Sequence, residues 1–80
     1  GLVLNLIIRL SSVEEIHDFV KRCSKLDCDI DLTCGRYTVD AKSILGVFSV
    51  DLRRDLKLNV YTDNKQYATE LLGDYVVKVA

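Results

Sequence analysis

The sequence predicts an α+β protein, a two-layer sandwich in which helices cover one face of a four-stranded antiparallel sheet. Two observations predict this class. Apolar and polar residues alternate over residues 2–9, 30–39 and 56–62, as in strands with one buried face. Apolar residues recur at helical spacing over residues 13–26 and 64–75. Strands with one dry face and interspersed amphipathic helices favour this sandwich, here as one domain over residues 1–80 in the order β-α-β-β-α-β-α.

The first helix has a well-defined start after the strand at residues 2–9. Ser12 can accept a hydrogen bond from the Glu15 amide, and the Glu15 side chain can reach back to the Ser12 amide. Such a cap is worth ~1 kcal/mol. We therefore expect a helix over residues 13–26.

The middle of the chain predicts a hairpin and a short helix. Residues 30–39 alternate on either side of Gly35, which predicts a turn at Cys34-Gly35. Residues 41–48 are too few and too apolar for a free-standing helix, so we expect one or two helical turns pressed against the body.

The last predicted strand and helix are indicated by the same kinds of sequence pattern. Residues 56–62 keep a polar side, which indicates a sheet with one solvated face. Asp63 and Gln66 repeat the capping-box spacing ahead of a second amphipathic helix over residues 64–75.

Composition narrows the functional classes. Apolar residues make up 49% of the 80-residue chain and charged residues 29%, the balance of a soluble globular protein. The formal net charge is −1 with scattered charges, so we expect neither nucleic acid nor membrane as a partner. The longest apolar run, residues 2–10, is shorter than the about 20 residues that span a bilayer. The four tyrosines are expected to be half-buried packing residues.

The three cysteines, Cys23, Cys28 and Cys34, are odd in number and form no C-x-x-C pair. They indicate reduced, mostly buried thiols in a cytoplasmic protein. Adding His17 gives spacings untypical of zinc sites, so no metal and no cofactor are expected.

One run of residues, together with the order of elements, resembles a known family. The run Asp-Ala-Lys-Ser-Ile-Leu-Gly-Val-Phe-Ser-Val at residues 40–50 lies between the Gly35 hairpin and the strand at 56–62. This arrangement resembles HPr, the histidine-containing phosphocarrier protein of the bacterial sugar phosphotransferase system. The resemblance covers nearly the whole chain and is most specific over residues 27–60. It implies an HPr-like open-faced sandwich and a non-enzymatic bacterial protein of the cytoplasm.

The chain departs from that family at its phosphorylation motif. In HPr proteins the first helix begins with His-x-Arg-Pro, whose histidine takes a phosphoryl group from enzyme I and passes it to a sugar permease component. The matching positions here are Ser12, Val13, Glu14 and Glu15, so the histidine, arginine and proline are all absent. Ser12 uses an amide for capping, and two carboxylates stand where a phosphate would bind. We therefore expect no catalytic residue.

Ser43 is the family position that remains. In HPr proteins of Gram-positive bacteria the serine in a Lys-Ser-Ile context is phosphorylated by an ATP-dependent kinase, and the modified form binds a transcriptional regulator. The resemblance makes Ser43 a candidate regulatory site, with a phosphate stabilised by the helix start and by Lys42. It also makes an apolar patch the candidate docking surface, namely Ile44, Leu45 and Phe48. Alternatively, Ser43 only caps the short helix and the three apolar residues belong to the core.

Three functions follow from these residues. The first is a non-catalytic regulatory or binding module whose partners are phosphotransferase system components, an HPr kinase or a transcriptional regulator. The second is an active phosphocarrier that uses an unorthodox residue such as His17 or Ser12. The third is a structural or oligomerising domain that has left the pathway.

Overall fold

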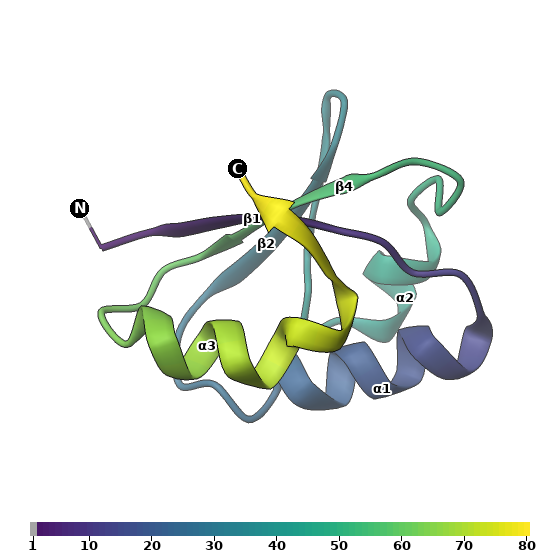
Figure 1. Cartoon of the computed structure of the whole chain (residues 1–80). Coiled ribbons are helices and arrows are strands. Elements are labelled where there is room, and N and C mark those ends of the chain that lie inside the picture. The colour runs from purple at the N-terminus through teal and green to yellow at the C-terminus, as the bar shows by residue number, and fades with distance from the viewer. Residues whose placement is uncertain (1) are drawn as a thin grey trace.

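A computed structural model describes residues 2–80 and places α1 and α3 beneath an antiparallel sheet (Figure 1). The elements in chain order are β1 (Leu4–Ile8), α1 (Val13–Cys23), β2 (Ile30–Cys34), β3 (Tyr37–Asp40), α2 (Ile44–Phe48), β4 (Leu56–Val60), α3 (Lys65–Leu72), a 3-10 turn η1 (Gly73–Tyr75) and β5 (Val76–Val79). The predicted α+β class, the antiparallel sheet and the layer of helices are confirmed.

The strand order in the sheet is β3-β2-β4-β1-β5. Leu6 of β1 and Leu32 of β2 both lie opposite Leu58 of β4, so leucines from three neighbouring strands point to the helical layer. All three are fully buried. Their alternation with polar residues is the pattern that predicted these strands, and it leaves the opposite sheet face open.

The sheet has five strands rather than the predicted four, because the residues after the predicted last helix form a strand, β5. α3 stops at Leu72, and the turn η1 covers the last residues of the predicted helix, up to Tyr75. β5 begins at the next residue, Val76. β5 pairs antiparallel with β1, placing Val79 opposite Leu6. The amides of Arg9 and Ala80 bond across this junction to the carbonyls of Tyr75 and Asn5, at 3.0 and 2.9 Å. Three valines in four residues suit a strand better than a helix.

Other boundaries also differ from the predictions: β1 is Leu4–Ile8 instead of residues 2–9, and β4 is Leu56–Val60 instead of residues 56–62. α1 ends at Cys23, and the chain continues through turn hydrogen bonds to Leu26, which is still buried. The hairpin turns at residues 35–36, one residue later than predicted, because Gly35 takes the left-handed conformation with φ +61°. The cap of α3 is Asn64 rather than Asp63, since the Asn64 side chain accepts the Tyr67 amide at 3.3 Å.

The buried side chains form one hydrophobic cluster without a buried polar or charged residue among those described. Phe19 of α1 is fully buried and meets the ring of Tyr75 edge to face, with ring centroids 5.9 Å apart. Cys23 lies in the same core, where burial raises the pKa of its thiol to about 12. Cys28 and Cys34 are half-buried, and all three cysteines are free thiols.

A polar network fastens the turn before β5 to α1. The Arg22 guanidinium bonds the carboxylates of Asp18 and Asp74, at 2.8 and 2.7 Å, and the carbonyl of Leu71 at 3.1 Å. It also lies 5.1 Å from the centre of the Tyr75 ring. The Tyr75 hydroxyl donates to Asp18 at 2.5 Å, and this bond is the main cause that lowers the pKa of Asp18.

Candidate functional site

The start of α1 is capped by its own residues. Ser12 has an extended backbone, and its Oγ accepts the amide hydrogen of Glu15 at 3.1 Å. The Ser12 carbonyl accepts the amide of Ile16 at 3.1 Å, which closes the first helical turn. The predicted role of Ser12 as the cap matches this geometry, and the Glu15 amide is unavailable to a bound anion.

The Glu15 carboxylate occupies the space in front of the helix. Its Oε1 accepts hydrogen bonds from both the amide and the hydroxyl of Ser11, each at 2.8 Å. The prediction that Glu15 bonds the Ser12 amide was therefore wrong by one residue. Glu15 and the exposed Glu14 together place two carboxylates in the first turn of α1, where a helix attracts negative charge.

Ser43 caps the short helix α2. The half-buried Ser43 Oγ accepts the Gly46 amide at 3.1 Å, and the Ser43 carbonyl accepts the Val47 amide at 2.9 Å. A Cβ atom at Gly46 would lie 3.3 Å from Ser43 Oγ and from the Cβ of Val39. Glycine therefore lets the helix approach both Ser43 and β3 closely.

Lys42 is directed away from the position expected for it. Its ammonium donates to the carbonyl of Leu26, in the loop that follows α1, at 2.6 Å. The carboxylate of Asp40, two residues before Lys42, accepts the amide hydrogen of Lys42 at 2.9 Å. Lys42 would have to release the Leu26 carbonyl before it could reach a phosphate on Ser43. That Lys42 stabilises such a phosphate therefore stays a prediction.

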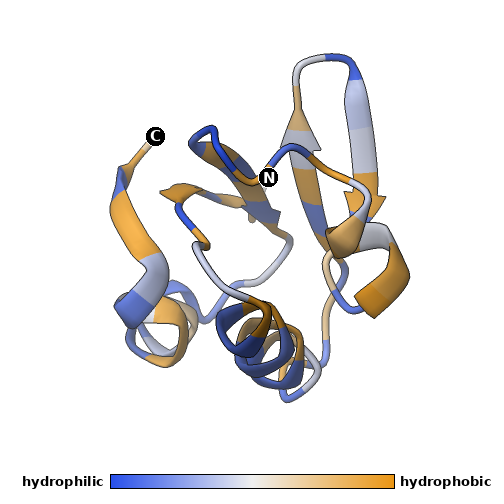
Figure 2. Cartoon of the chain, turned by 90° about the vertical axis from the view of Figure 1, so that its right-hand side faces the viewer, coloured by the Kyte–Doolittle hydropathy of each residue, from blue (hydrophilic) through white to orange (hydrophobic). Residues whose placement is uncertain are grey.

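The three residues of the predicted docking patch differ in exposure. Leu45 is 80% exposed and Phe48 is 41% exposed. Ile44 is partly buried and packs against the core, so it belongs to the core more than to the surface. Figure 2 shows α2 as a largely hydrophobic helix at the side of the molecule.

α1 extends this apolar surface. The exposed ring of His17 meets Phe48 edge to face, with ring centroids 6.0 Å apart. Val13, four residues before His17 and on the same side of the helix, is also exposed. We define the α1–α2 surface as Val13, His17, Leu45 and Phe48. The i, i+4 spacing of Val13 and His17 was visible in the sequence, but their approach to Phe48 was not.

Two further observations concern metal binding and membrane-spanning helices. Residues 2–80 hold no group of three or more His, Cys, Asp or Glu side chains placed to bind a metal ion. Within the same range, each helix is too short or too polar to cross a membrane.

Comparison with known proteins gives a family match and two structural likenesses. The family model described as "PTS HPr component phosphorylation site" matches residues 15–76. The crystal structure of HPr-C-His from Thermoanaerobacter tengcongensis is 25% identical, with a TM-score of 0.72 over 90% of this chain and 86% of that chain. The phosphocarrier protein HPr from Bacillus anthracis str. Ames is 22% identical, with a TM-score of 0.74 over 95% and 99%. No curated protein sequence gives a significant match.

Proposed function

Because the chain belongs to the HPr family of the phosphotransferase system, we propose that it is a non-catalytic member that acts as a regulatory or binding module. The start of α1 carries this proposal. A phosphocarrier needs a phosphorylatable side chain there and free donors for the phosphoryl oxygens. This chain has Ser12, which caps the helix, and Glu15, whose carboxylate already takes the donors of Ser11.

The family match itself begins at residue 15, three residues after Ser12. The position of the family's phosphohistidine, Ser12, therefore lies outside the matched range. This supports a chain that keeps the scaffold while its phosphorylation site has diverged.

Neither His17 nor Ser12 is well placed to replace the missing histidine. His17 lies in the second turn of α1, past the amides at the helix start, and its ring contacts Phe48. A phosphoryl group on Ser12 would lie next to the carboxylates of Glu14 and Glu15, whose charges repel it. The arginine that would grip a phosphoryl group at this position of the family motif is replaced by Glu14.

We assign regulation to Ser43 and docking to the α1–α2 surface. Partners in this function are phosphotransferase system components, an HPr kinase or a transcriptional regulator, in the cytoplasm of a sugar-transporting bacterium. Exposed Leu45 and Phe48 support docking, because apolar side chains that gather on a surface mark interaction sites. Phosphorylation would replace the bond between Ser43 and Gly46 with a dianion at the start of α2.

We expect an HPr kinase with ATP to place one phosphate on this chain at Ser43, detected by mass spectrometry of the intact chain and its fragments. The Ser43→Ala variant should stay unmodified. Ser49→Ala is the matched control, because Ser49 caps the other end of the same short helix and donates to the Gly46 carbonyl at 2.6 Å. An unmodified wild-type chain that also binds no phosphotransferase component would contradict the proposed function.

We expect phosphoenolpyruvate and enzyme I to leave this chain unlabelled under conditions that charge an ordinary HPr. The reason is that the first turn of α1 carries the carboxylates of Glu14 and Glu15, and that Ser12 already accepts the Glu15 amide. Radiolabel transfer measures this directly. Labelling that disappears in His17→Ala or Ser12→Ala would instead establish an active phosphocarrier with that residue as its carrier.

A further inference from the structure

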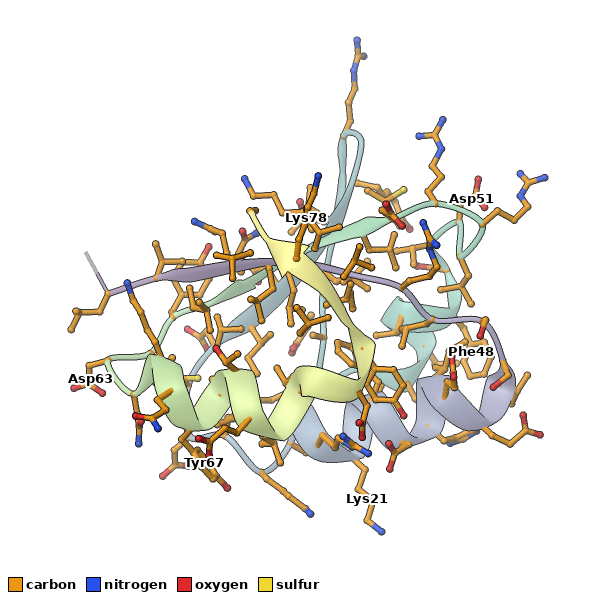
Figure 3. The ribbon with its side chains drawn as sticks, in the orientation of Figure 1. Lys21, Phe48, Asp51, Asp63, Tyr67 and Lys78 are labelled. Carbon is orange, nitrogen blue, oxygen red and sulfur yellow. The ribbon has the colours of Figure 1, made fainter. Side chains whose placement is uncertain are left out.

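A groove lies at the end of the molecule away from α2. It is an open hollow of about 530 Å³ between the loop after α1 and the loop that joins β4 to α3, a size typical of ligand sites. Figure 3 shows Asp63 and Tyr67 at this end and Phe48 at the other. The lining of the groove includes Leu2, Lys25, Asp27, Tyr61, Asp63 and Tyr67.

Two aromatic rings line the groove where the sequence suggested only half-buried packing. Tyr61 is 47% exposed and Tyr67 is 46% exposed, and exposed Leu2 lies in the same lining. A second cavity of about 350 Å³ lies next to the first and shares Tyr61 with it. Tyr61 therefore lines both hollows.

Acidic side chains line both hollows. Asp27 and Asp63 line the first cavity, and Asp29, Asp31 and Asp40 line the second. The one cation in either lining is Lys25, while the nearby Lys42 ammonium bonds the Leu26 carbonyl.

The carboxylates of the groove are largely free to meet a partner. Among residues 2–80, Asp27, Asp29 and Asp63 enter no ion pair. Asp31 accepts the Tyr61 hydroxyl at 3.1 Å, and this bond is the main cause that raises the pKa of Tyr61. That bond also fixes the ring of Tyr61, which lines both cavities, with its hydroxyl directed at Asp31 of the second cavity.

We propose that this groove binds a basic peptide segment of a partner protein, with two neighbouring Arg or Lys side chains lying against Tyr61 and Tyr67 and reaching the surrounding aspartates. Tyrosine faces attract cations, and free carboxylates complete the site. Two cavities that share Tyr61 in their linings suit two neighbouring cationic side chains better than one.

A second copy of this chain is a poorer occupant. Its two pairs of adjacent basic residues are at 21–22 and 53–54. Arg22 is held by Asp18 and Asp74, and Arg53 and Arg54 both pair with Asp51. Either pair would have to break its own contacts before it could enter the groove of a neighbour.

The probe for this site is a fluorescein-labelled, capped hexapeptide of sequence Gly-Ser-Arg-Arg-Ser-Gly, followed by fluorescence anisotropy. We expect saturable binding that weakens when the ionic strength rises from about 0.01 M to about 1 M, because the Debye length then falls from about 30 to about 3 Å. A peptide with both arginines replaced by glutamine should not bind.

Variants locate the site. Tyr67→Ala should weaken binding about threefold through loss of a ring, and alanine maintains the helix. The double variant Asp27→Asn, Asp63→Asn should weaken it about fivefold through loss of two carboxylates. Glu14→Gln removes one negative charge at the start of α1, outside the groove lining, and should leave binding unchanged.

Binding that falls equally in Glu14→Gln, or that the glutamine peptide reproduces, would overturn the proposal by showing a general charge effect. Absence of binding at low ionic strength would overturn it as well. If sedimentation shows the chain self-associating through the same aspartates, the occupant is a second copy and the proposal is wrong. Ser43→Ala should bind the peptide normally, so this test is independent of the kinase experiment.

Discussion

The Phe19→Ala variant is expected to lose about 3–5 kcal/mol of unfolding free energy, the usual cost of removing a buried phenylalanine ring. Phe19 is fully buried beneath the sheet, and its ring also contacts Tyr75 edge to face. A domain of 80 residues has only about 4–12 kcal/mol in total at the usual 0.05–0.15 kcal/mol per residue. A single cavity at this position therefore removes a large share of the stability of the whole fold.

Urea denaturation followed by circular dichroism measures this loss from the shift in the midpoint. Val13→Ala is the matched control, because it also shortens an apolar side chain of α1 but at an exposed position. We expect the control to change the unfolding free energy by less than about 0.5 kcal/mol. A loss below about 1 kcal/mol in Phe19→Ala would show that this ring does not lie in the core.

The second large effect is an alkaline loss of stability that depends on Tyr75. Burial raises the pKa of Tyr75 to about 12 from an ordinary value of 10.0, and its hydrogen bond to Asp18 adds to the shift. The folded state therefore holds this proton more tightly than the unfolded state does. The resulting stability is fully present below pH 10 and is lost as the pH rises through about 12. At about 1.4 kcal/mol per pKa unit, the loss is about 2–3 kcal/mol.

Tyr75→Phe isolates this contribution, because it keeps the ring and removes the titrating hydroxyl. We expect the variant to be about 1–2 kcal/mol less stable at neutral pH, where it lacks the bond to Asp18. Its stability should then fall less steeply than that of the wild type above pH 10. Cys23 also titrates late in the folded state, but it is present in both proteins and cancels in their difference.

Denaturant titrations at several pH values between neutral and strongly alkaline give the two curves. Tyr37→Phe serves as a control, since Tyr37 is exposed on the outermost strand β3. Parallel curves for wild type and Tyr75→Phe would show that the Tyr75 proton does not contribute to folding.

Most of the fold could be predicted because its strands carry a local signal. Leu4, Leu6 and Ile8 recur with period two, and Asn5 and Arg9 occupy positions on the other side, which is the pattern of a half-buried strand. β5 was missed for the opposite reason. Its four residues are mostly exposed, and it is a strand because β1 offers it a free edge. That partner is about 70 residues away in sequence, and no local pattern reports it.

The candidate site was predictable to the same degree. Ser12 and Ser43 are caps in the structure as their spacing suggested, since a capping bond joins residues only three positions apart. The bond of Lys42 to Leu26 joins residues 16 positions apart and depends on how the loop after α1 meets α2. The groove lined by Tyr61 and Tyr67 also depends on long-range packing, because it is assembled from three separate segments of the chain.

The position of β5 has a consequence for how this protein meets other chains. Because β5 lies along β1, the first strand is bonded on both sides, to β4 and to β5. An exchange of β1 between two copies would have to open two rows of hydrogen bonds instead of one. The strands left at the rims, β3 and β5, have four residues each, which makes them short templates for an incoming strand. A few residues after the last helix thus help to keep each chain folded on itself.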